Sequence, residues 1–186
     1  MRKLALFALM AVPGLVSAAE TEMTLKGVSM PVAIQQDGRK LELNGMGVRT
    51  KIVFKVYVAG LYLEKTSRDG MAVASSEQLK RIELVFLRSV DGKTVAEAIA
   101  EGFSNNAGET LPALNDRIAK MEKMIPDVKK GDRLVFVYRP GTGIEITANG
   151  KPAGSIEGKD FADVLFKVWV GDKPADKSLK NGLLGL

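Results

Sequence analysis

The chain has 186 residues, enough for one domain that buries a core of its own. It contains no histidine and no cysteine, which excludes Ser-His-Asp hydrolases, Cys-His enzymes and metal sites built from imidazole or thiolate. The formal net charge is +5, but basic and acidic residues alternate along the chain. That pattern is typical of a solvated surface, and it predicts no nucleic-acid partner.

The first residues follow the pattern of a secretory signal peptide. Arg2 and Lys3 precede an uncharged, largely apolar run at residues 4–16, and small residues follow at 17–19. The run is shorter than the ~20 residues that a membrane-spanning helix needs. We therefore expect an exported protein of the bacterial periplasm, with no stable membrane anchor after cleavage.

The cleavage site has two candidates, because the small-residue rule is satisfied after Ala18 and after Ala19. We assign residues 1–19 to the signal peptide and residues 20–186 to a single mature domain. No cysteine follows the apolar run, so the chain offers no thiol for lipid attachment.

The first part of the mature chain is predicted to be rich in strands. Residues 30–34 and 40–43 read as strands around the turn at residues 36–38, Gln-Asp-Gly. Residues 51–64 are apolar on both alternating faces, which predicts one long central strand. Gly60 within it indicates a bulge or a close backbone contact.

A further strand is predicted around residues 82–87, and two helices follow it. The first helix carries Val95, Ile99 and Phe103 at intervals of four residues. The second has Thr110 as its expected N-cap and an apolar stripe formed by Leu111, Leu114, Ile118, Met121 and Ile125.

The last part of the chain predicts a three-strand meander and two helices. The meander's second turn, Asn149-Gly150, favours a type I′ hairpin. Helices are expected over residues 161–168 and from about 175 to 184. Strands and helices are thus grouped and do not alternate, which predicts an α+β fold with a large antiparallel sheet backed by a helical layer.

Two segments resemble the chalcone isomerase-like family, namely GMGVRTKIVFKVYVAGLYLE at residues 45–64 and FADVLFKVWVGDKPADKSLKNGLLG at residues 161–185. The resemblance covers nearly the whole mature chain and is closest to the exported bacterial branch. It implies an open-faced β-sandwich with a ligand cleft between sheet and helices. Plant members of this family are either true isomerases, which cyclise a chalcone to a flavanone, or relatives that bind fatty acids or act without catalysis.

The resemblance also implies candidate site residues. The isomerases use an arginine that stabilises a phenolate, together with a threonine, a tyrosine and an asparagine that hold a water and polarise a ketone. Arg49 matches the arginine, and Asn106 is the candidate asparagine. Tyr57 stands at the threonine, Ile99 at the tyrosine and Val168 near a second threonine that contacts the flavonoid. These replacements favour a member without isomerase activity.

Arg49 and Tyr57 suit a carboxylate head group, since a guanidinium donates two parallel hydrogen bonds and a phenol adds a third. Asn106 completes the candidate ligand-binding set. On one straight strand, residues 49 and 57 would share a face but lie ~26 Å apart. A bend or loop before Lys51 must therefore bring them together.

Three functions remain open at this point: a binder of a fatty acid or similar amphipathic carboxylate, an isomerase or lyase with Arg49 as oxyanion stabiliser, and an envelope interaction module without a small ligand. Arg49 could equally be a loop arginine that contacts carbonyls or an acid, Tyr57 a core aromatic residue and Asn106 a helix cap. Tyr62 and Trp169 read as packing residues. No cofactor and no metal are expected, and no protein partner can be named.

Overall fold

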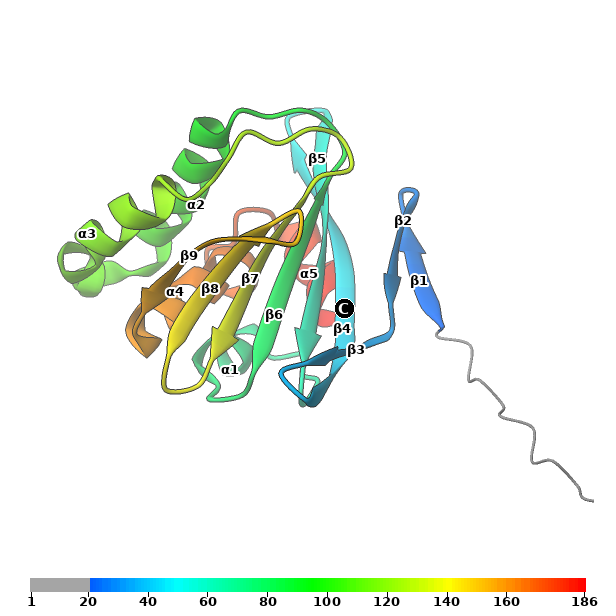
Figure 1. The fold of residues 1–186 in the computed structure, drawn as a ribbon, viewed down its shortest axis with the longest axis horizontal. Helices are drawn as coiled ribbons and strands as arrows, with labels where there is room; N and C mark the ends of the chain where they lie inside the picture. Colours follow the sequence, from blue (N-terminus) through cyan, green and yellow to red (C-terminus); the bar gives the residue numbers. More distant parts are fainter. Residues whose placement is uncertain (1–20) are drawn as a thin grey trace, which may run out of the picture.

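The structure is a computed structural model that describes residues 21–186; the predicted signal peptide lies outside the described residues. A seven-stranded antiparallel sheet runs in the order β3-β4-β5-β6-β7-β8-β9, and the helices lie on one of its faces (Figure 1). The helices and strands are β1 (Glu22–Leu25), β2 (Val28–Pro31), β3 (Ala33–Gln36), β4 (Arg39–Lys51), β5 (Phe54–Leu63), α1 (Gly70–Ser75), β6 (Lys80–Phe86), α2 (Gly92–Asn106), α3 (Leu111–Glu122), β7 (Arg133–Arg139), β8 (Gly143–Ala148), β9 (Lys151–Glu157), α4 (Lys159–Val170) and α5 (Lys177–Leu184).

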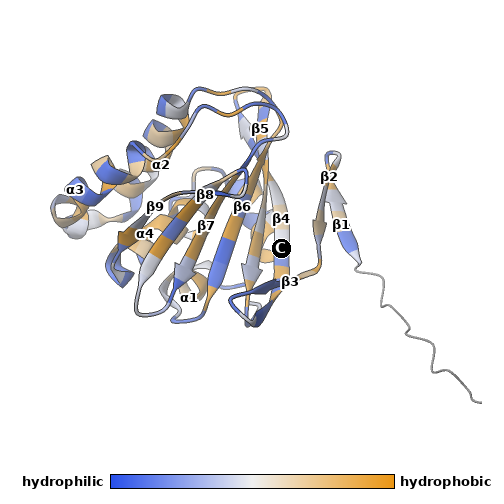
Figure 2. Ribbon diagram, in the orientation of Figure 1, coloured by the Kyte–Doolittle hydropathy of each residue, from blue (hydrophilic) through white to orange (hydrophobic). Residues whose placement is uncertain are grey.

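The two faces of the sheet carry different cores. On β5, Ala59, Leu61 and Leu63 point into the main core under the helices, whereas Val58 and Tyr62 belong to a smaller cluster on the other face. The β1–β2 hairpin packs on that smaller cluster, and the apolar stretches of the strands appear orange in Figure 2. The fold is therefore the α+β arrangement of a sheet backed by helices that the order of elements predicted, and it agrees with the open-faced β-sandwich that the family resemblance implied.

The strand boundaries differ from the prediction at one important place. Residues 45–50, which precede the predicted central strand, form the second half of β4, which is 13 residues long. The chain then reverses at Ile52-Val53, so residues 51–64 are not one strand. The expected strand at residues 30–34 divides between β2 and β3, and β1 and α1 are additional to the predicted elements.

The glycines of β4 explain why its second half did not read as a strand. A Cβ on Gly47 would lie 2.5 Å from the carbonyl oxygen of Leu179 on α5. A Cβ on Gly182 would in turn lie 2.4 Å from the carbonyl oxygen of Met46. Helix α5 therefore rests directly on the backbone of β4, and the two segments that carry the family resemblance pack against each other.

Most predictions from local sequence patterns, of turns and close backbone contacts, agree with the structure. Asn149 and Gly150 have φ of 51° and 75°, which confirms the predicted type I′ turn. Gly60 makes a close contact, since a Cβ there would lie 2.3 Å from the sulfur of Met30. Thr110 stands at the N-cap position of α3, as predicted, but its side chain does not cap the helix: its hydroxyl donates backwards to the carbonyl oxygen of Ala107 at 2.7 Å.

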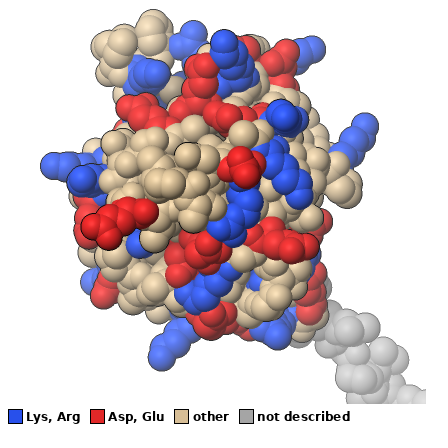
Figure 3. Space-filling view, turned by 90° about the vertical axis from the view of Figure 1, so that its left-hand side faces the viewer, with Lys and Arg blue, Asp and Glu red and all other residues tan. Residues whose placement is uncertain are grey.

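Acidic and basic side chains are interspersed over the face shown in Figure 3. Within residues 21–186, no helix combines the length and the apolar character needed to cross a membrane.

Candidate ligand-binding site

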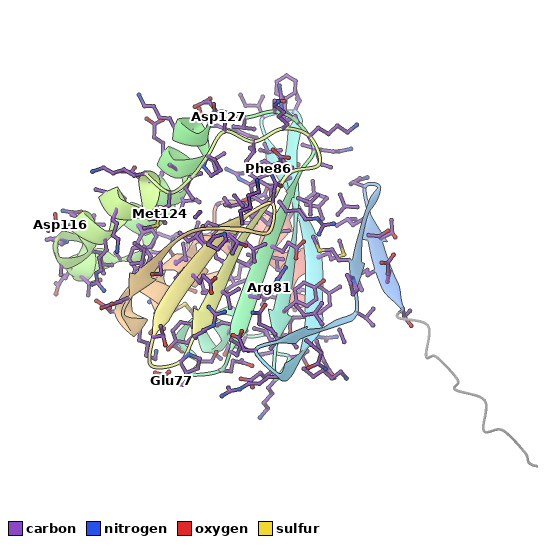
Figure 4. The ribbon with its side chains drawn as sticks, in the orientation of Figure 1. Glu77, Arg81, Phe86, Asp116, Met124 and Asp127 are labelled. Carbon is purple, nitrogen blue, oxygen red and sulfur yellow. The ribbon has the colours of Figure 1, made fainter. Side chains whose placement is uncertain are left out.

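A cavity of about 610 Å³ opens between the helices and the end of the sheet at the top of Figure 1. Its volume falls within the ~300–1,000 Å³ of small-molecule sites. Five segments line it: the β4–β5 hairpin, β6 with the loop after it, α2, the loop at residues 127–129 and α4 with the segment after it. In Figure 4, Phe86 marks the upper end of β6 and Asp127 lies beside the first turn of α2.

The wall is mostly apolar. Its apolar residues come from both the sheet and the helical layer and are Ile52, Phe54, Val56, Leu84, Phe86, Val90, Val95, Ala98, Ile99, Val128, Val168, Trp169 and Ala175. Polar and charged side chains take up only a part of the surface. Such a wall suits a ligand that is apolar over most of its length.

The reversal at Ile52-Val53 places Arg49 directly opposite Tyr57 on the neighbouring strand, as Cα partners in the β4–β5 ladder. Residues opposite each other in an antiparallel pair project from the same face with Cβ atoms ~5 Å apart. The turn thus supplies the reversal that a shared head-group site requires. Both residues line the cavity.

Arg49 is held from the side by α5. Its Nη1 donates to the carbonyl oxygen of Thr50 at 2.9 Å and lies 3.6 Å from Oδ2 of Asp176. Asp176 is the N-cap of α5 and also accepts the backbone N–H of Thr50 at 3.0 Å. Burial tends to raise the pKa of Asp176, but hydrogen bonds from backbone amides and the charge of Arg49 lower it overall.

The guanidinium keeps most of its hydrogen-bonding capacity. Arginine has five N–H donors, and within residues 21–186 the bond to Thr50 is the only hydrogen bond of the Arg49 side chain. The side chain is 21% exposed, so the cation lies at the wall of the cavity and not in bulk solvent.

Tyr57 is oriented by Trp169. The indole Nε1–H of Trp169 donates to the phenol oxygen of Tyr57 at 3.1 Å, and the Tyr57 ring packs edge-on against Phe86 with centroids 5.6 Å apart. Burial raises the pKa of Tyr57 to about 12, so the phenol is neutral near pH 7. Because its oxygen already accepts a bond, the phenol hydrogen is left to donate to a ligand.

Of the other positions that the family resemblance singled out, two line the cavity and one does not. Ile99 on α2 and Val168 on α4 line the cavity together with Arg49 and Tyr57. Asn106 does not line it: its amide nitrogen donates to the carbonyl oxygens of Gly102 at 2.9 Å and Lys173 at 2.8 Å. Asn106 therefore ties the end of α2 to the segment after α4, which is the capping alternative.

Three residues outside the predicted site set help to shape the site. Trp169 was read as packing, yet it fixes the phenol of Tyr57 across 112 positions of sequence. Asp176 is 126 positions from Thr50, which it binds. Arg88 stacks on Phe54 at the cavity mouth, 4.6 Å from the ring centroid. Only Asp176 had a local signal, as a residue suited to cap the helix that follows it. In the described part of the chain, no cluster of three or more His, Cys, Asp or Glu could hold a metal.

Comparison with known families decides the classification. The model of the family described as chalcone isomerase-like matches residues 22–185. The chain belongs to the chalcone isomerase-like family. This confirms the family resemblance seen in the sequence, whereas assignment to an exported bacterial branch stays a prediction.

A solved structure supports the same fold. The crystal structure of an Arabidopsis thaliana fatty-acid binding protein superposes with a TM-score of 0.73 at 14% identity, covering 88% of this chain and 96% of that one. At this identity the likeness establishes the fold alone. A search of curated proteins gives no match.

Proposed function

We propose that this member of the chalcone isomerase-like family binds a fatty acid or a similar amphipathic carboxylate. Arg49 and Tyr57 hold the head group, and the apolar wall surrounds the tail. The observation that carries the proposal is the pairing of these two residues across β4 and β5, with donors left over, at the wall of an apolar cavity. The name of the Arabidopsis thaliana neighbour, a fatty-acid binding protein, supports the choice of ligand.

The apolar replacements favour a tail over a flavonoid. Ile99 and Val168 line the cavity at positions where the resemblance to the isomerases calls for polar side chains. Burying a methylene group against such residues contributes about 0.8 kcal/mol. An alkyl chain gains from this wall, whereas the hydroxyls and ketone of a chalcone lose partners there.

The isomerase alternative rests on Arg49, which could also stabilise an oxyanion. Such a reaction needs a group that takes and returns a proton near pH 7. Tyr57 is unsuited to that task because its pKa is about 12. The acids at the mouth, Asp91 and Asp127, accept backbone N–H groups of Thr94 and Gly92.

The proposed compartment is the bacterial periplasm. The signal-peptide pattern of residues 1–19 supports this location. Osmotic release of the periplasm from cells that express the whole chain tests it. Recovery of the processed protein in that fraction is the expected result, and retention of the unprocessed chain in the cytoplasm would contradict it.

The binding proposal is tested first by native mass spectrometry of the mature protein, followed by titration with saturated fatty acids of increasing length. We expect a co-purified carboxylate and an affinity that rises about fourfold per methylene until the cavity is filled. Arg49→Ala should weaken binding about 10- to 100-fold, because it removes hydrogen bonds to a charged group.

The control is Arg68→Ala, which removes an exposed arginine that does not line the cavity. This variant should bind like the wild type. The fatty-acid affinity of Arg49→Lys should lie between those of the wild type and Arg49→Ala, since lysine keeps the positive charge but not the paired donors of the guanidinium group. Equal affinities of the wild type and Arg49→Ala would exclude the head-group site, and turnover of a chalcone that Arg49→Ala abolishes would favour the isomerase.

A further inference from the structure

The tip of the β4–β5 hairpin carries three consecutive exposed apolar side chains. Ile52, Val53 and Phe54 are 88%, 76% and 55% exposed. Ile52 and Val53 are the two most exposed large apolar side chains in residues 21–186. No packing within the described fold accounts for this cluster, and contiguous exposed apolar groups mark interaction surfaces.

The backbone at the tip is a second, independent observation. Ile52 has φ of +61°, in the left-handed region that β-branched residues rarely adopt. The sheet's other tight turns place Gly, Asn or Asp at such angles, as at Asp37-Gly38 and Asn149-Gly150. The tip thus keeps an apolar side chain where a polar residue would suit the backbone better, which points to a role outside folding.

Basic side chains surround the apolar tip. Lys51 and Lys55 flank it on the two strands, and both are exposed. Arg88 stacks on Phe54 with its guanidinium carbon 4.6 Å from the ring centroid. Lys129 lines the mouth of the same cavity. An apolar tip ringed by cations matches the chemistry of an anionic lipid surface, where apolar groups enter the acyl boundary and cations contact phosphates.

The two acids at the mouth do not cancel this pattern. Asp91 accepts the N–H and hydroxyl of Thr94 at 2.8 and 2.7 Å as the N-cap of α2. Asp127 accepts the N–H of Gly92 at 2.7 Å. Both carboxylates are therefore turned toward the start of α2, and the hairpin itself carries only basic charges beside its apolar tip.

We propose that the hairpin tip inserts into the interface of a bilayer that contains anionic phospholipid, with Lys51 and Lys55 on the phosphates. The cavity mouth, which Ile52 and Phe54 help to line, then faces the membrane surface. This extends the proposed function by giving an amphipathic carboxylate a short path between bilayer and cavity. The insertion rests on the hairpin alone, and the two proposals fail separately.

A single thiol tests insertion directly, because the chain has no cysteine of its own. The mature protein with Val53→Cys, labelled with an environment-sensitive dye, is mixed with vesicles of phosphatidylcholine and phosphatidylglycerol. We expect a blue shift that vesicles of phosphatidylcholine alone do not produce. The same dye at Thr66→Cys, just beyond the other end of β5, should not respond. No shift at position 53, or equal shifts at both positions, would overturn the proposal.

Vesicle sedimentation measures the contribution of each group. Val53→Ser should weaken binding to the anionic vesicles about tenfold, through loss of apolar contact. Lys55→Glu should weaken it at least tenfold, and raising the salt concentration should weaken it further. The matched control, Lys65→Glu, reverses an exposed charge at the opposite end of β5 and should have little effect.

The two proposals are separated by measuring fatty-acid binding in solution with the same variants. Val53 and Lys55 do not line the cavity, so their substitution should leave that affinity unchanged. If the wild type does not sediment with anionic vesicles, or if Val53→Ser and Lys55→Glu sediment like the wild type, membrane insertion is wrong even where fatty-acid binding holds.

Discussion

Two hairpins of the same sheet meet a similar backbone requirement with different residues. In the β8–β9 hairpin, Asn149 and Gly150 take positive φ, and the side chain of Asn149 accepts the N–H of Arg133 at 2.8 Å. In the β4–β5 hairpin, Ile52 takes φ of +61° with its side chain in solvent. The first turn is explained by folding. The second is not, and it lies at the mouth of the cavity.

The two hairpins also differ in why they require glycine. Around Gly150, no atom lies within 4 Å of a Cβ placed there, so only its φ of +75° requires glycine. Gly47 beside Arg49 is required by space, because α5 touches the backbone of β4. At the cavity end of the sheet, α5 thus packs against β4, and its N-cap residue Asp176 contacts Arg49. This contact fixes the position of Arg49 in the proposed head-group site.

The largest effect is expected from substitution of these two glycines. Gly47→Ala forces a methyl group against the carbonyl oxygen of Leu179 and should cost about 3 kcal/mol of unfolding free energy. Gly150→Ala meets open space and should cost about 1 kcal/mol through its left-handed backbone alone. Urea denaturation measures both values. Similar losses in the two variants would mean that α5 does not hold β4 as closely as the structure has it.

Exchanging the turn residues between the two hairpins should change the stability of the protein in opposite directions. Asn149→Ile should destabilise the protein by about 2 kcal/mol, since it places a β-branched residue at positive φ and removes the bond to Arg133. Ile52→Asn should stabilise it by about 1 kcal/mol. Thermal and urea denaturation check both signs. A destabilised Ile52→Asn would show that Ile52 contributes to folding and would weaken the case for a functional tip.

The sequence predicted the fold where local rules govern it. The order of strands and helices, the turn at Asn149-Gly150 and the apolar faces follow from periodicity and turn chemistry. The reversal at Ile52-Val53 could not be predicted, because two β-branched residues within an apolar run indicate a strand interior. Residues 45–50 were not predicted as a strand, because their glycines are explained only by the contact with α5.

The candidate site was predictable only in part. Arg49 and Tyr57 were identified from the family resemblance, but their pairing depends on a turn that the sequence conceals. The contacts of Tyr57 with Trp169 and of Arg49 with Asp176 join residues more than a hundred positions apart. Contacts of this kind leave no local pattern, so the polar surroundings of the site required the structure.

The smallest expected effect concerns the ionisation of Tyr57 on β5, a strand that also carries Tyr62; the β8–β9 hairpin has no tyrosine. Burial raises the pKa of Tyr57 to about 12, and that of Tyr62 in the second cluster also to about 12. In the unfolded chain a tyrosine ionises near pH 10. Between pH 10 and 12 the unfolded state therefore binds fewer protons than the folded state.

The contribution of these two tyrosines to the unfolding free energy should accordingly be constant below pH 10 and fall as the pH rises toward 12, by on the order of 1 kcal/mol for each tyrosine. Tyr57→Phe should remove its share of that fall, which urea denaturation at pH 8 and at pH 11 measures. The same variant should lower fatty-acid affinity at pH 8 about fivefold, through loss of one hydrogen-bond donor.

If the fall in unfolding free energy at alkaline pH is the same in Tyr57→Phe as in the wild type, the phenol reaches solvent in the folded state. The hydrogen bond from Trp169 would then not hold the Tyr57 hydroxyl in the cavity. A reduced slope with unchanged affinity would leave Arg49 as the sole proposed head-group contact and confine the role of Tyr57 to packing in the β4–β5 hairpin.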